Sequence, residues 1–143
     1  MPPLSDELIL GLLAKDSSSR ADNAAILEYF NEHPDLAERK QVLLNMVDAM
    51  KILDIEHPNI ALLTMVEKPC FHMRDTVEAQ TLVAKHKKYP IADCNIAGPI
   101  SYDLIMSKEA ARLKEYDCPY CGEFDGIVVP NLMAGNLLVK VLM

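Results

Sequence analysis

The sequence of 143 residues contains no tryptophan and has fewer basic than acidic side chains. Its 14 Lys and Arg residues against 21 Asp and Glu residues give a formal net charge of −7. This charge argues against nonspecific binding to nucleic acid, because phosphate backbones are bound by clusters of Lys and Arg. An anionic ligand is still possible, since one local arginine or one helix N-terminus suffices to bind a phosphate.

Long apolar runs are also missing. No segment reaches the length of a membrane span, and the N-terminus lacks the basic start and apolar stretch of a secretory signal. The four cysteines therefore indicate reduced thiols in a cytosol. We expect a cytoplasmic protein with neither a membrane nor a nucleic-acid partner. Its length, with 50% hydrophobic and 24% charged residues, suits one globular domain.

Residues 1–34 are predicted to form a helical N-terminal segment. The spacing of its leucines predicts one helix over residues 4–14, and a second is expected over residues 22–32, ended by His33-Pro34-Asp35. A long amphipathic helix follows over residues 36–53. We assign Arg39 to its solvated face, opposite an apolar stripe made by Leu36, Leu43, Met46, Val47, Met50 and Leu53.

Residues 35–143 are predicted to form an α/β domain with three layers and a mostly parallel sheet. Short apolar runs predict strands over residues 59–66, 92–97 and 125–130. The helices between and after them are expected over residues 75–86, 102–114 and 132–142, the first opening with a capping box from Asp75 to Glu78 and the last capped by Asn131. Ligands of such sheets bind beyond the carboxyl ends of the strands, here residues 67–69, 98–100 and 130–131.

The segment Val129–Lys140, VPNLMAGNLLVK, resembles the VP(D/N)xxxGNxxxK signature of phosphate acetyl- and butyryltransferases. Further segments resemble motifs of the same family in the same order. They are ALLTMVEK at 61–68, MRDTVEAQ at 73–80, GPISYDLIMS at 98–107 and CPYCGEFD at 118–125. The similarity covers about residues 35–142, is nearer to the butyryltransferase branch, and corresponds to the second domain of these enzymes.

The resemblance implies an enzyme with two α/β domains, an active site between them, and a dimer contact made largely by the second domain. It implies that acyl-CoA and phosphate react to give acyl phosphate and free coenzyme A, with coenzyme A as a substrate and no cofactor or metal. The first domain has no counterpart here, and the apolar run over residues 137–143 looks like one that expects a neighbouring domain. We therefore expect a homodimer, or a second chain that carries the missing domain.

Two departures from the family pattern lead us to expect little turnover by this chain alone. Ala97 and Met133 stand where the family usually has carboxylates. The alternative is a non-catalytic module of the same descent that dimerises or binds coenzyme A. A small α/β protein of unrelated role that binds coenzyme A or a nucleotide is disfavoured by the series of motifs.

Ser19-Arg20-Ala21-Asp22 resembles the SRAD motif, which in this family lies near the C-terminus and supplies active-site groups. The resemblance makes Arg20 the candidate for the phosphoryl group, Ser19 a hydrogen-bond donor and Asp22 a catalytic carboxylate. Coincidence is the alternative, with Arg20 a solvated residue beside a helix N-cap.

The substrate-binding candidates of the matched domain are Asn131, Gly135, Asn136, Gly98, Pro99 and Arg74. Asn131 and Gly135 have equally good structural explanations as a helix cap and as a site of close helix–sheet packing, and Gly98 and Pro99 as turn formers. No metal site is predicted, because Cys118-Pro119-Tyr120-Cys121 is not completed by a second such pair. Ordinary thiols are the favoured interpretation of these cysteines over a redox pair.

Overall fold

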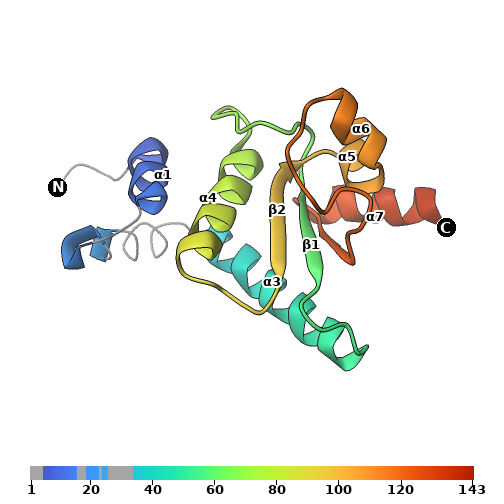
Figure 1. Cartoon of the computed structure of the whole chain (residues 1–143), viewed down its shortest axis with the longest axis horizontal. Coiled ribbons are helices and arrows are strands. Elements are labelled where there is room, and N and C mark those ends of the chain that lie inside the picture. The colour runs from blue at the N-terminus through green and yellow to red at the C-terminus, as the bar shows by residue number, and fades with distance from the viewer. Residues whose placement is uncertain (1–4, 16–18, 23, 26–33) are drawn as a thin grey trace.

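A parallel three-stranded sheet forms the centre of the molecule in a computed structural model that describes residues 5–15, 19–22, 24–25 and 34–143 (Figure 1). The strands are β1 (Asn59–Leu63), β2 (Asn95–Ile100) and β3 (Gly126–Val128). They lie in the order β2-β1-β3, and β1 pairs in parallel with both neighbours. The predicted α/β class with a mostly parallel sheet is confirmed.

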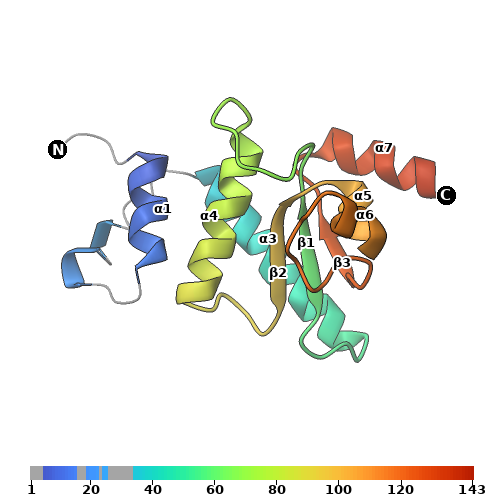
Figure 2. The same cartoon turned by 45° about the horizontal axis from the view of Figure 1, so that its top comes forward.

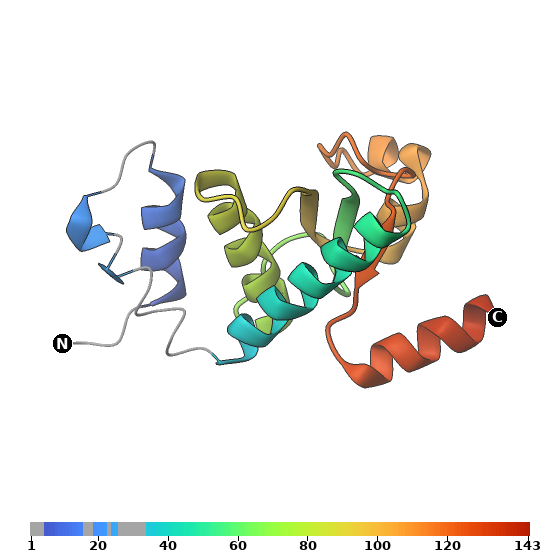
Figure 3. The same ribbon diagram turned by 90° about the horizontal axis from the view of Figure 1, so that it is seen from below.

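Helices cover both faces of the sheet because β1 is apolar on both. Ile60 and Leu62 point to the layer of α3 (Pro34–Ile52) and α4 (Arg74–Lys88), whereas Ala61 points to α5 (Tyr102–Met106) and α6 (Lys108–Leu113). Figure 3 shows α3 running across the sheet from the side of α4 to the opposite end. The result is the expected three-layer arrangement.

Helix α1 (Asp6–Ala14) lies outside these layers and packs against α4 (Figure 1). Its buried side chains Ile9, Leu12 and Leu13 join the hydrophobic core on that face of the sheet. The Lys88 ammonium group of α4 donates a hydrogen bond to the Leu12 carbonyl at 2.9 Å. The helix predicted over residues 22–32 falls mostly outside the described residues.

All three strands differ from their predicted bounds, and β3 is shorter than predicted at both ends. Strand β1 ends at Leu63, because the Thr64 hydroxyl donates to the Val66 carbonyl at 2.7 Å and turns the chain. Strand β2 begins at Asn95 and includes Gly98 and Pro99, so the prediction that these two residues break the strand is wrong. Gly98 is needed there because a β-carbon at this position would lie 2.7 Å from Leu62 Cβ on the neighbouring strand.

Two of the predicted helices differ in more than their end residues. The helix expected over residues 102–114 is two short helices, separated by Ser107, whose side chain accepts a hydrogen bond from the Ala110 N–H at 3.1 Å. The predicted capping box is absent. Helix α4 begins at Arg74, and the Glu78 carboxylate turns away to pair with Arg39 at 2.9 Å.

Helix α7 (Leu132–Leu142) matches its predicted bounds and projects from the body of the molecule (Figure 2). None of its residues is buried, although most of them are apolar. Across the described part of the chain, no helix combines the length and the apolar character needed to cross a membrane.

We expect Gly98→Ala to lower the free energy of unfolding by about 1 to 3 kcal/mol, the usual cost of overpacking a core. The new methyl group would meet Leu62 Cβ at 2.7 Å and the Leu62 carbonyl oxygen at 3.1 Å, and neither atom can move without the strand. Gly11→Ala is the matched control, because nothing lies within 4 Å of its added methyl group. Urea unfolding compares the two variants, and equal stabilities would contradict the close packing of β1 on β2.

We expect a pH dependence of stability from His57, which joins the loop before β1 to the loop before β2. Its imidazole lies 2.5 Å from an Asp93 carboxylate oxygen and 3.1 Å from Asn95 Oδ1, and these contacts raise the pKa of His57 above its ordinary value. Protonation is therefore favoured in the folded state. This contribution is complete below the unfolded pKa of about 6.5 and is lost as the pH rises through the folded pKa.

His57→Asn isolates this effect. Residue 57 has a φ of 49°, which asparagine tolerates better than other non-glycine residues. The measurement is the difference in urea midpoint between the wild type and the variant from pH 5.5 to pH 8.5. We expect that difference to shrink as the pH rises, and a constant difference would show that the imidazole does not titrate with folding.

Candidate functional site

An open cleft of about 860 Å³ lies at the carboxyl ends of the three strands, where the sequence predicted a site. Its walls are the end of β1, the loop before α4, the start of α5 and the start of α7. The lining residues are Leu63, Thr64, Met65, His72, Met73, Arg74, Asp75, Ser101, Tyr102, Asp103, Pro130, Asn131, Met133, Ala134 and Leu137. The cleft thus combines an apolar wall with a few polar groups, as ligand sites do.

Arg74 lies in this cleft, as predicted for a substrate-binding residue. It is the first residue of α4, and its side chain is 43% exposed. Its Nε atom lies 3.8 Å from a carboxylate oxygen of Glu78, one helical turn further on. A guanidinium group in such a position can present its planar fork to a phosphoryl or carboxylate group.

Asn131 also lines the cleft and caps α7 at the same time. Its side-chain oxygen accepts a hydrogen bond from the Ala134 N–H at 2.8 Å. Gly135 packs closely, since a β-carbon there would lie 2.8 Å from Val129 Cγ2. The structure thus confirms both structural explanations, and a role for Asn131 in binding remains a prediction. Asn136 is exposed and is not among the residues that line the cleft.

Gly98 and Pro99 lie inside β2 and do not line the cleft. The Pro99 carbonyl accepts a hydrogen bond from the Tyr116 hydroxyl at 3.0 Å, which ties the loop after α6 to the end of this strand. Burial raises the pKa of Tyr116 above its usual range. Neither residue lines the cleft of this chain, and a role for them in substrate binding remains a prediction.

A second charged group of the cleft, Asp103, was not among the predicted site residues. Its carboxylate is bound by the Lys114 ammonium group at 2.8 Å and by the Ser101 hydroxyl at 2.6 Å. These hydrogen bonds, first that of Lys114, lower the pKa of Asp103 to about 2. Asp103 is therefore a fixed negative charge at neutral pH and a weak proton acceptor. Its place in the matched GPISYDLIMS segment was the signal that could have found it.

The predicted catalytic residues Ser19, Arg20 and Asp22 do not lie in the cleft. Their segment lies beyond α1, on the far side of α4 from the sheet (Figure 1). Ser19 and Asp22 cap each other, because the Asp22 N–H donates to Ser19 Oγ at 3.1 Å and the Ser19 N–H donates to the Asp22 carboxylate at 3.3 Å. Arg20 is exposed. Within one chain, the structure does not bring this group together with Arg74 and Asn131.

The assignment of Arg39 to a solvated helix face is wrong. Its side chain is only 13% exposed, its Nε atom lies 2.9 Å from Glu78, and its Nη2 atom donates to the Pro130 carbonyl at 3.1 Å. Arg39 and Glu78 therefore lie directly beneath the cleft. Arg112 is 69% exposed and pairs with Glu109 on the same helix, as expected for a solvated arginine.

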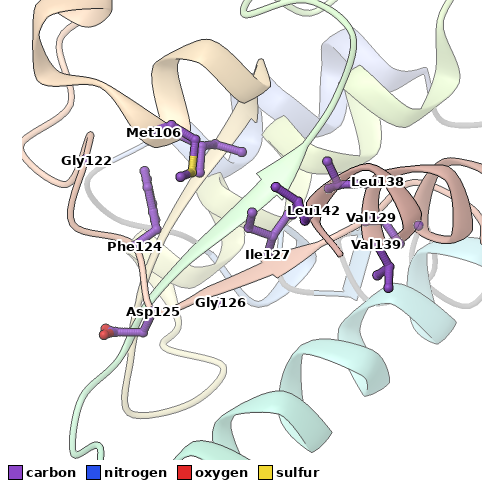
Figure 4. Close-up of a pocket in the computed structure, with 12 residues that line it drawn as sticks. Met106, Gly122, Phe124, Asp125, Gly126, Ile127, Val129, Leu138, Val139 and Leu142 are labelled. Atoms are coloured by element: carbon purple, nitrogen blue, oxygen red, sulfur yellow. The ribbon is translucent and has the colours of Figure 1, made fainter.

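A second cavity, about 550 Å³, lies between α5, β3 and α7 and is lined mainly by apolar side chains (Figure 4). Ile127, Val129 and Leu138 are among its walls. Its acidic residue Asp125 points its carboxylate away from the cavity and accepts a hydrogen bond from the Asn59 N–H at 2.8 Å. The cavity therefore lacks the polar groups that chemistry requires, and it is an apolar groove beside a projecting helix.

The cysteines have the features of ordinary thiols. All four are free. Burial raises the pKa of Cys121 and of Cys94 to about 11, so both stay protonated at neutral pH. Within the described ranges, no three histidine, cysteine or acidic side chains are grouped so that they could hold a metal ion.

Comparison of the sequence with known proteins identifies relatives that match most of this chain. A family model described as Phosphate acetyl/butaryl transferase matches residues 28–143. The phosphate acetyltransferase of Rhizobium meliloti is 32% identical over 110 residues, which are 77% of this chain and 35% of that protein. The phosphate butyryltransferase of Clostridium acetobutylicum is 31% identical over 113 residues, which are 79% of this chain and 38% of that protein.

A solved structure gives the same result in three dimensions. The crystal structure of a branched-chain phosphotransacylase from Enterococcus faecalis V583 aligns with a TM-score of 0.69 and 33% sequence identity. The alignment covers 75% of this chain and 38% of that one. The chain thus spans a little over one third of the length of the relatives it matches.

We expect Asn131→Ala to speed the hydrogen exchange of the Ala134 amide about fivefold, since the loss of an N-cap costs about 1 kcal/mol. Asn131→Asp keeps an acceptor and should leave this exchange rate near that of the wild type. Asn136→Ala, on an exposed position of the same helix, is the control for general fraying. An unchanged Ala134 rate in Asn131→Ala would show that the cap does not hold the start of α7.

Proposed function

Because the chain belongs to the phosphate acetyl/butyryl transferase family, we propose that it forms one wall of a cleft in which a short acyl group passes between coenzyme A and phosphate. The observation that carries the proposal is the position of the cleft. It opens at the carboxyl ends of the parallel strands, between the start of α4 with Arg74 and the start of α7 with Asn131.

The reaction sets the requirements for such a cleft. A phosphate oxygen attacks the thioester carbonyl carbon, the C–S bond breaks, and coenzyme A leaves as a thiolate that takes up a proton. The phosphate needs a cation, for which we propose Arg74, and the carbonyl oxygen needs hydrogen-bond donors as its negative charge grows. These bond changes require neither a metal nor an organic cofactor, and coenzyme A takes part as a substrate.

Asp103 of the cleft is a weak proton acceptor for the thiol in the reverse reaction, and two carboxylates of the family pattern are missing from this chain. Asp103 is held ionised by Lys114, with a pKa of about 2, and Ala97 and Met133 carry no carboxylate. We propose that the two missing carboxylates are supplied from outside this wall. We therefore propose that the isolated chain has little turnover and that the complete site forms in a homodimer or with a second chain that carries the other domain.

Helix α7 supports a partner of this kind. Its apolar residues Leu132, Val141 and Leu142 are at least 60% exposed, and the apolar groove of Figure 4 lies along its inner side. An exposed apolar surface of this kind marks an interaction site in a water-soluble fold. We propose a cytoplasmic location, where coenzyme A and phosphate are present and thiols stay reduced.

The exposed apolar surface of α7 also favours the second candidate, a non-catalytic module that dimerises or binds coenzyme A. In this function the cleft would hold its ligand without turnover. The predicted roles of Ser19, Arg20 and Asp22 also depend on assembly, since within one chain these residues lie far from the cleft and only a second copy could bring them to it.

The test follows the release of free thiol from butyryl-CoA in the presence of phosphate, together with phosphate binding measured by calorimetry. We expect little or no thiol release by the purified chain. We expect Arg74→Ala to weaken phosphate binding about tenfold or more, because its guanidinium group is the cation proposed to bind the phosphate. Arg112→Ala, which removes an exposed arginine outside the cleft, should bind phosphate like the wild type.

The outcomes separate the two candidates. Robust phosphate-dependent release would show that the chain builds a whole site, and a loss of that activity in Arg20→Ala would then place Arg20 in it. Ligand binding without release would favour the non-catalytic module. Equal phosphate affinities of the wild type and Arg74→Ala would contradict the role of Arg74.

A further inference from the structure

A continuous chain of charged and polar groups passes beneath the cleft. Glu78, whose side chain is 8% exposed, uses its two carboxylate oxygens for two different arginines. One oxygen lies 2.9 Å from Nε of Arg39 on α3, and the other lies 3.8 Å from Nε of Arg74 on its own helix. Arg39 continues the chain by donating from Nη2 to the Pro130 carbonyl at 3.1 Å. We call this chain of contacts the Glu78 bridge.

The two ends of the Glu78 bridge are opposite walls of the cleft. Arg74 begins α4, and Pro130 immediately precedes Asn131, which caps α7. The cleft is lined by Arg74, Pro130 and Asn131. It is not lined by Glu78 or Arg39. Glu78 therefore contacts no ligand in this cleft, but it is joined to both of the walls between which a ligand would lie.

Burying the charged groups of the Glu78 bridge is energetically unfavourable, so the presence of the bridge calls for a functional explanation. A carboxylate loses much of its hydration in such a position, and only well-placed partners offset that loss. Burial raises the pKa of Glu78 above its ordinary value, although the charges of Arg39 and Arg74 act in the opposite direction. Asp35 of α3 and Asp75 of α4 also raise it. An apolar side chain would fill the same space at lower cost, but it could not orient two guanidinium groups.

We propose that Glu78 is a positioning residue for phosphate recognition, which sets the direction of the Arg74 side chain and, through Arg39, fixes the segment between β3 and α7 that carries Asn131. The inference rests on the proposed function for the nature of the ligand. It goes beyond that function because it assigns the geometry of the site to a residue that touches no substrate.

Positioning and simple electrostatics predict opposite results when the charge is removed. If Glu78 acted only as a negative charge near Arg74, its loss would make the cleft more positive, and inorganic phosphate would bind more tightly. If Glu78 orients Arg74, its loss removes a contact that favours one direction of that side chain, so the side chain occupies more rotamers. Phosphate would then bind more weakly, because it must order the side chain itself.

The experiment uses Glu78→Gln in the full chain, with Glu109→Gln as the matched control. Glu109 also pairs with an arginine, but both side chains are exposed and lie on α6, outside the cleft. The chain has only four arginines, so its Nε–H groups give four NMR signals that single Arg→Lys variants can assign. Titration with inorganic phosphate follows the Arg74 signal. We expect the dissociation constant to rise at least fivefold in Glu78→Gln and to stay unchanged in Glu109→Gln.

A second readout needs no ligand. The Ala134 amide donates to the Asn131 cap on the opposite side of the cleft from Arg74. In Glu78→Gln we expect this amide to exchange its hydrogen at least threefold faster. The Ala110 amide, which donates to the Ser107 cap outside the bridge, should keep its wild-type rate. Equal acceleration at both amides would mean a general loss of stability and would overturn the proposal, as would unchanged or tighter phosphate binding.

Failure of the proposed function would give a different pattern. Without any shift of the Arg74 signal in the wild type, phosphate recognition by this cleft is excluded, and the proposal for Glu78 as a phosphate-positioning residue is overturned with it. The Ala134 readout then still decides whether the bridge fixes the segment between β3 and α7. If Glu78→Gln does not fold, Glu78→Asp keeps the charge and shortens its reach by one methylene. We expect Glu78→Asp to weaken phosphate binding at least twofold, and wild-type affinity would overturn the proposal.

Discussion

The parallel pairing of β1 with both of its neighbours is the constraint on which the rest of the structure depends. Because all three strands run in one direction, their carboxyl ends meet at one edge, and the loops after them must share that edge. The pairing of β1 with β2 shifts register between Ala61 and Leu63, where Gly98 of β2 lies close against Leu62 of β1. The cleft is thus a consequence of strand direction and requires no special loop to create it.

The cleft also shows how an acidic protein can present a local positive site. With a net charge of −7, the long-range field repels anions, so binding must rely on a guanidinium group at short range. Lys114 is not available for this role, since Asp103 holds it at 2.8 Å. Arg74 is one half of an ion pair with Glu78 whose longer 3.8 Å contact leaves its side chain partly exposed to the cleft.

Much of the architecture was predictable because it follows from short-range patterns. The apolar runs predicted three parallel strands, and Asn131 before an apolar helix predicted the cap and bounds of α7. The site was less predictable. Ser19 and Asp22 have the spacing of a capping motif as well as that of a catalytic one, and four residues of sequence cannot distinguish the two.

Arg39 shows a different difficulty. It follows Leu36 by three residues and precedes Leu43 by four, so it lies on the buried stripe of α3 by helical spacing alone. Its charge suggested a solvent-exposed side chain, but its position in the apolar stripe correctly indicated burial. What no spacing could show is its partner, because Glu78 and the Pro130 carbonyl become neighbours only through the packing of α3 and α4 on the sheet.

The contact between Arg39 and Pro130 joins groups that are 91 positions apart in the chain. Such a contact closes a long loop, and the entropy lost in closing it is recovered only after the intervening helices and strands have packed. The geometry of the cleft is therefore one of the last properties that the folding chain acquires. During synthesis, the ribosome must release the chain at least through Pro130 before the two walls of the cleft can pack against each other.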